Sequence, residues 1–147
     1  MVLTESIRSL AKQATLVISA HTALLVINNY AHEKIDLLYS LTPHMPLLLF
    51  FCLAPLVVAF FLPTQNARQG AVVLLGILPA VLIYNIVTRF MALPPMTQQE
   101  PSLIWKILYE GSFGFVLVFE VIAFWFTFKL LREIHTQLNK PTENVPK

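Results

Sequence analysis

Four apolar segments, each about as long as a membrane-crossing helix, constrain this chain more than any other feature. They lie at about residues 11–32, 45–63, 70–90 and 105–130 of the 147. A helix needs about 20 mostly apolar residues to cross the hydrocarbon core of a bilayer. The segments are continuous apolar runs, unlike the alternating strands of a membrane barrel, and they show no internal repeat and no sustained heptad pattern. The sequence therefore predicts an all-α integral membrane protein with four transmembrane helices.

The composition agrees with a surface that faces lipid. Hydrophobic residues make up 56% of the chain and charged residues 12%, whereas a soluble domain carries about 25% charged residues. The net charge of +2 is small and the basic residues are scattered, which is not the pattern of a nucleic-acid-binding protein. We therefore expect a lipid bilayer around this chain, and no nucleic acid partner.

Lysine and arginine are distributed unevenly between the two sides that four spans would create. With the N terminus inside, the cytoplasmic residues are Arg8, Lys12, Arg68, Lys129, Arg132, Lys140 and Lys147, and the opposite ones are Lys34, Arg89 and Lys106. Because positive charge favours the cytoplasmic side, we predict an up-down-up-down bundle with both termini in the cytoplasm, in a bacterial inner (plasma) membrane. Residues 1–136 would form this single domain, and the polar tail 137–147, with two prolines, is expected to be disordered.

Two ionisable residues interrupt the apolar runs at the same predicted depth. Glu120 lies in GSFGFVLVFEVIAFWF near the middle of the fourth run, and His21 lies near the middle of the first. At 1.5 Å of rise per residue, Glu120 is roughly 5 Å from the membrane centre, and the first and fourth helices of such a bundle can be neighbours. An unpaired carboxylate there costs at least about 2.5 kcal/mol. A His21–Glu120 contact is therefore geometrically possible, as a structural clasp or as a ligand- or proton-binding site.

The second and third runs each carry a proline near their middle. Pro55 and Pro79 have no N–H to donate to the carbonyls of Phe51 and Leu75. Backbone groups freed at membrane depth have to be satisfied inside the bundle. All four predicted helices thus bring a polar or helix-breaking feature to the midplane, as the walls of a small intramembrane cavity would.

A second group of polar residues is predicted toward the outer face. It consists of Asn28 in the first run, Asn85 and Arg89 near the end of the third, and Glu110 near the start of the fourth. Arg89 could pair with Glu110 or with Glu33 at the interface, and such exposed pairs are usually worth little.

No motif in the sequence indicates a metal or a cofactor. The chain has no HExxH, HxxH or CxxC spacing, no GxSxG elbow and no phosphate-binding loop, and its single cysteine, Cys52, excludes an internal disulfide. His21 has no histidine at its own depth with which to hold a haem. We therefore expect no metal site, and a binding protein more readily than an enzyme.

Two functions fit these features. The first is binding, as an accessory subunit of a membrane complex or as a bundle that holds a lipophilic ligand around His21 and Glu120, with other membrane subunits or further copies of the chain as partners. It is favoured by aromatic residues around the whole circumference of the fourth run, which cannot all turn inward: Phe113, Phe115, Phe119, Phe124, Trp125, Phe126 and Phe128. The alternative is a proton-coupled small-molecule transporter that uses Glu120 with Trp125 nearby.

Overall fold

The computed structural model describes residues 4–35, 45–91 and 102–139, which form four α-helices. The helices are α1 (Glu5–Ile35), α2 (Met45–Phe61), α3 (Ala67–Met91) and α4 (Leu103–Leu138). Each corresponds to one predicted apolar run, and no strand occurs in these three ranges. The prediction of an all-α fold is therefore confirmed. The polar tail beyond Asn139 lies outside the described residues.

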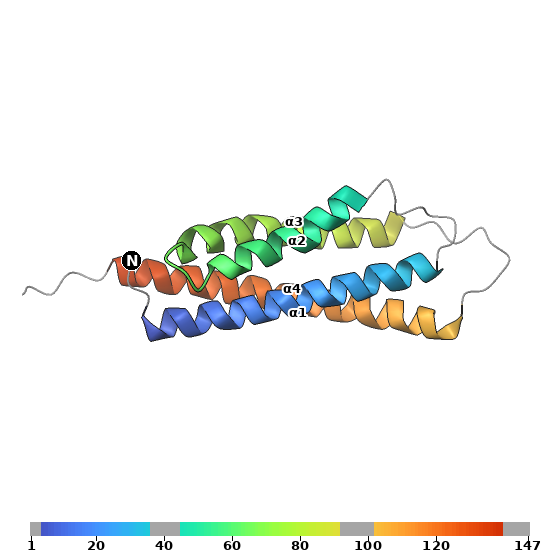
Figure 1. Ribbon diagram of the computed structural model, residues 1–147, viewed down its shortest axis with the longest axis horizontal. Coiled ribbons are helices and arrows are strands. Elements are labelled where there is room, and N and C mark those ends of the chain that lie inside the picture. Colours follow the sequence, from blue (N-terminus) through green and yellow to red (C-terminus); the bar gives the residue numbers. More distant parts are fainter. Residues whose placement is uncertain (1–3, 36–44, 92–101, 140–147) are drawn as a thin grey trace, which may run out of the picture.

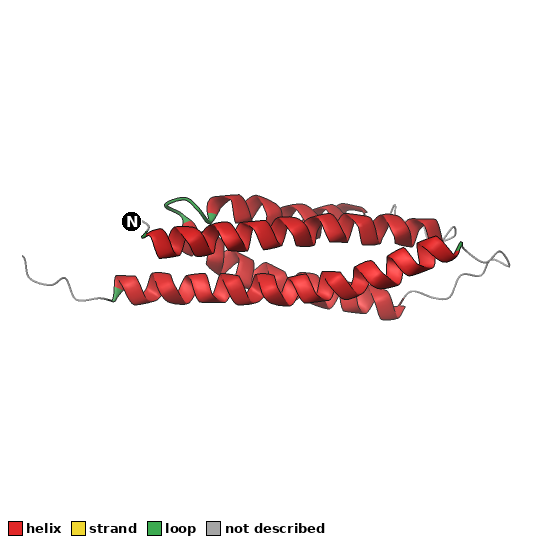
Figure 2. Ribbon diagram, turned by 90° about the horizontal axis from the view of Figure 1, so that it is seen from below, coloured by secondary structure: helices red, strands yellow, loops and turns green. Residues whose placement is uncertain are grey.

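The four helices lie side by side with their long axes roughly aligned, and each successive helix runs opposite to the one before it (Figure 1). Helices α1 and α4 form one layer and α2 and α3 the other (Figures 1 and 2). Each helix packs against two neighbours, in the cyclic order α1, α2, α3, α4, and the most extensive contact joins α1 to α4. The first and the last helix of the chain thus lie against each other along most of their length.

Three of the four helices are long and apolar enough to cross a membrane. The candidate spans are Glu5–His32, Ala67–Val87 and Leu103–Leu138. Helix α2 is apolar but has only 17 residues, or about 25 Å at 1.5 Å per residue, which is less than the roughly 30 Å of a bilayer core. It ends at Phe61, two residues before the expected boundary, because Leu62 precedes Pro63 and a residue before proline disfavours the helical conformation.

The buried apolar side chains form two separate clusters. The larger cluster consists of Ile7, Leu10, Ala11, Ala14, Ile18, Ala59, Leu62, Ala67, Ala71, Leu74, Leu78, Ala123, Leu130 and Ile134. The smaller one consists of Leu25, Cys52, Val81 and Val116. On both α1 and α4, the boundary between the clusters falls at a buried ionisable residue, His21 on α1 and Glu120 on α4.

Large apolar side chains also cover the outside of the bundle. Leu16, Phe60, Ile83 and Val121 are each more than 60% exposed, and they come from four different helices. A monomeric soluble protein rarely exposes apolar side chains over such continuous areas. The outer surface therefore suits hydrocarbon rather than water.

Candidate functional site

His21 and Glu120 meet in the interface between α1 and α4. The Nε2 atom of His21 lies 3.6 Å from Oε2 of Glu120, and the side chains are 0% and 2% exposed. The antiparallel arrangement of the two helices places residues counted from opposite ends at the same level (Figure 1). The contact that the depth argument allowed is thus present, and it is enclosed by protein on all sides.

The polar atoms of this pair have no hydrogen-bond partner in the part of the chain that the structure describes. This holds for Nδ1 and Nε2 of His21 and for both carboxylate oxygens of Glu120. The separation of 3.6 Å is beyond the usual 2.7–3.2 Å of an N–H···O hydrogen bond, about half an ångström too long. Burying a polar group without a hydrogen-bond partner costs free energy. An additional proton or a small polar molecule at this pair would therefore form hydrogen bonds that the pair lacks.

The chemistry available to the pair is the binding of a proton. With one shared proton, the pair is either an imidazolium beside a carboxylate or a neutral imidazole beside a carboxylic acid, and its total charge is the same. A metal ion is not indicated, because no group of three or more His, Cys, Asp or Glu side chains occurs within the described ranges, and structural zinc prefers four ligands.

Two threonine hydroxyls of α1 donate hydrogen bonds to backbone carbonyls of α2. The hydroxyl of Thr22, next to His21, donates to the carbonyl of Cys52 at 3.4 Å, and that of Thr15 donates to the carbonyl of Ala59 at 2.8 Å. Cys52 lies one residue after Phe51, whose carbonyl Pro55 was expected to free. Threonine hydroxyls commonly satisfy backbone groups next to a proline in membrane helices. The polar features of α1 and α2 are thus joined at the level of His21.

A second polar contact joins α1 to α4 farther along the interface. The side-chain amide of Asn28 donates to Oγ of Ser112 at 2.9 Å and to the carbonyl of Tyr109 at 3.0 Å. Sequence reasoning did not single out Ser112. It could have been found by spacing, because residues seven or eight apart share one face of a helix: Asn28 lies seven residues from His21, and Ser112 lies eight from Glu120.

The other residues of the predicted sites lie apart from these contacts. Trp125 is 53% exposed on the outside of α4, with Nζ of Lys129 lying 5.0 Å from its ring centroid, so its side chain does not lie beside Glu120. Asn85 is half-buried on α3, and Glu110 is exposed near the start of α4. The side chain of Arg89 lies outside the described residues, and its pairing with Glu110 stays a prediction.

Replacing Asn28 with leucine is expected to destabilise the bundle by about 1 kcal/mol, since hydrogen bonds between membrane helices are usually worth about 0.6–1.7 kcal/mol. The matched control is Asn29→Leu, because the amide of Asn29 donates at 2.8 Å to the Leu25 carbonyl of its own helix. Thermal unfolding of both variants in the same detergent measures the difference. Equal losses of stability in the two variants would show that the Asn28 contact does not hold α1 to α4.

The interface between α1 and α4 therefore carries two buried polar contacts, an enclosed ionisable pair and an amide–hydroxyl pair. Both connect the first helix of the chain to the last. Comparison of the chain with protein-family models, with curated proteins and with solved structures found no match.

Proposed function

We propose that this chain is an integral membrane protein whose four helices all cross the bilayer, with both termini in the cytoplasm of a bacterial cell. Three helices of sufficient length and an apolar outer surface support the membrane location. Helix α2 is short, but its sequence from Met45 to Phe61 contains no charged residue, and a short apolar helix can be accommodated by local thinning of the bilayer. The excess of lysine and arginine at the start of α1, at the end of α4 and at the start of α3 supports the orientation.

Within the membrane, the protein acts by binding, as an accessory subunit of a larger complex. The observation that carries this proposal is the outward face of α4, where Phe115, Trp125 and Phe128 are each more than half exposed. Aromatic residues are enriched at the centres of protein interfaces. A lipophilic ligand around His21 and Glu120 is less well supported, because the pair is enclosed and the helices would have to separate to admit one.

Crosslinking from the membrane-facing surface tests the proposal. A photoreactive phenylalanine analogue at Phe115 should crosslink to one protein of defined mass in the native membrane. The matched control is the same analogue at Leu16, which is 72% exposed on α1 and should crosslink to lipid. Native mass spectrometry after mild extraction should show the same partner in stoichiometric amount. A chain recovered only as a monomer or as a homo-oligomer, with no protein crosslink at Phe115, would contradict the accessory role.

The second candidate function is proton-coupled transport of a small molecule through the bundle. It is favoured by one observation, the buried ring nitrogens and carboxylate oxygens of His21 and Glu120 without hydrogen-bond partners within the described ranges. Ionisable residues inside a membrane often mark proton pathways. The two candidates differ in the role of Glu120, which exchanges a proton in the transporter and does not in the accessory subunit.

A further inference from the structure

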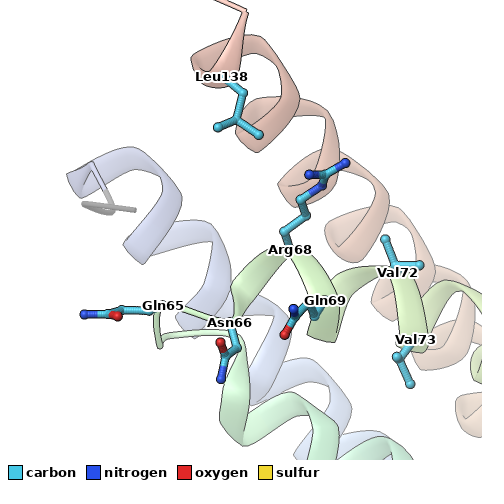
Figure 3. A pocket seen from close by; sticks show the side chains of 7 residues that line it. All are labelled: Gln65, Asn66, Arg68, Gln69, Val72, Val73 and Leu138. Atoms are coloured by element: carbon cyan, nitrogen blue, oxygen red, sulfur yellow. The ribbon is translucent and has the colours of Figure 1, made fainter.

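A groove lies at the end of the bundle where α2 turns into α3. Its volume is about 610 Å³, and it is lined by Gln65, Asn66, Arg68, Gln69, Val72, Val73 and Leu138. Figure 3 shows Arg68 extending from the first turn of α3 toward α4, with Leu138 near the end of that helix.

The lining of this groove changes from polar to apolar along the axis of α3. The polar side chains come from residues 65–69, and the two valines follow one turn later. Four residues from Arg68 to Val72 correspond to about 6 Å of helix rise. In the proposed orientation, the polar part of the lining on α3 lies toward the cytoplasmic surface of the membrane, and the two valines lie deeper. A molecule with a polar head and a hydrocarbon tail matches this order.

Arg68 gives the polar part of the groove a positive charge. Its side chain is exposed. Among the described residues, no carboxylate oxygen lies within 4.0 Å of its guanidinium, so it forms no salt bridge there. The surrounding end of the bundle also carries Arg8, Lys12, Lys129 and Arg132, against two acidic residues, Glu5 and Glu133. A guanidinium binds phosphate oxygens through two parallel hydrogen bonds. The charge of this end therefore complements an anionic head group.

We propose that this groove binds one anionic phospholipid, with the phosphate at Arg68 and the start of an acyl chain against Val72 and Val73. The inference rests on the proposed membrane location, in which this end of the bundle faces the cytoplasmic leaflet. Anionic lipids of that leaflet attract basic residues at the membrane surface. The lipid would cover the junction between the turn at residues 62–66 and the end of α4. These two elements are not consecutive in the chain.

The test is native mass spectrometry of the full chain taken from nanodiscs of equal parts phosphatidylglycerol and phosphatidylcholine. The wild-type chain should retain one phosphatidylglycerol per chain, and Arg68→Gln should lower the preference for it about fivefold, the effect expected of one basic residue near a membrane surface. Arg68→Lys keeps the charge and should retain much of the preference. The matched control is Arg8→Gln, an exposed arginine at the same end that does not line the groove.

Equal lipid preference in Arg68→Gln and Arg8→Gln would overturn the proposal. So would full competition by glycerol phosphate at the same concentration, because the acyl chain would then contribute nothing. Resistance of the wild-type chain to alkaline extraction from its own membrane is measured in parallel. Extraction of the wild-type chain would overturn the membrane location together with the lipid site, whereas a loss of lipid preference alone leaves the location standing.

Discussion

His21→Leu should be among the most destabilising single substitutions in this protein. It leaves the carboxyl group of Glu120, which is 2% exposed, buried without the imidazole that now lies beside it. The expected loss is about 2–3 kcal/mol, the penalty for an unpaired carboxylate in this environment. Glu120→Leu should cost less, about 1–2 kcal/mol, because a neutral imidazole is easier to bury than a charged carboxylate. Thermal unfolding in a fixed detergent and lipid mixture measures both losses.

The double variant, His21→Leu with Glu120→Leu, should be more stable than His21→Leu alone. Both polar groups are then gone, and two leucines can join the apolar clusters on either side. Replacing a buried ion pair with apolar residues of similar volume is often neutral or stabilising. Thr127→Val is the matched control, since Thr127 is fully buried on α4 and its hydroxyl donates to the Ala123 carbonyl of its own helix. Strictly additive losses in the double variant would mean that the two residues do not interact.

Glu120→Gln separates a structural clasp from a transport site, because glutamine keeps the shape of the side chain and removes its ability to exchange a proton. In a transporter, this variant should abolish proton-coupled activity while folding and assembly remain intact. In a clasp, Glu120→Gln and His21→Ala should both lower yield or thermal stability, and their combination should be no worse than either alone. A Glu120→Gln protein with unchanged stability and unchanged cellular phenotype would remove both roles.

The sequence could assign His21 and Glu120 to one depth, and so allow a contact between them, because depth in a membrane helix follows from counting residues. Each residue lies near the middle of its apolar run, and the rise per residue is fixed. The antiparallel order of α1 and α4 then sets both at one level. The same counting relates Asn28 to Ser112, which lie seven and eight residues from His21 and Glu120.

The sequence could not show which face of each helix points inward. In a soluble protein the inward face is the apolar one, but here Leu16 is 72% exposed and Ile18 is fully buried two residues later. Eight buried residues of α1 are spaced three or four apart: Ile7, Ala11, Ala14, Ile18, His21, Leu25, Asn28 and Ala31. Leu10 and Thr22 are also buried, each next to a member of this series. No heptad pattern was visible because the outward positions are apolar too. Trp125 was placed near Glu120 for the same reason, although five residues correspond to about 140° of helix rotation.

Small residues mark the inward face better than apolar ones, and Ala123→Phe should therefore be strongly destabilising. Ala123 is fully buried in the larger cluster, which also contains Ala14 and Ile18 of α1. Interfaces between membrane helices are enriched in small residues that let the backbones approach closely. A phenyl ring at this position would push α1 and α4 apart, at an expected cost of about 1–3 kcal/mol or more. The melting temperature in detergent should fall by several degrees.

Val121→Phe is the matched control, because it places the same ring on the same helix two residues away, at a position that is 61% exposed. Its stability should be close to that of the wild-type protein. Ala123 lies less than one turn from Glu120, so separation of the helices at Ala123 should also lengthen the 3.6 Å contact between Glu120 and His21. We compare the stability of His21→Leu with that of the double variant His21→Leu, Glu120→Leu in each background. The difference between them should shrink when Ala123→Phe is also present. It should persist when Val121→Phe is present instead. If both backgrounds keep the full difference, the close packing of α1 against α4 is not what holds the buried pair together.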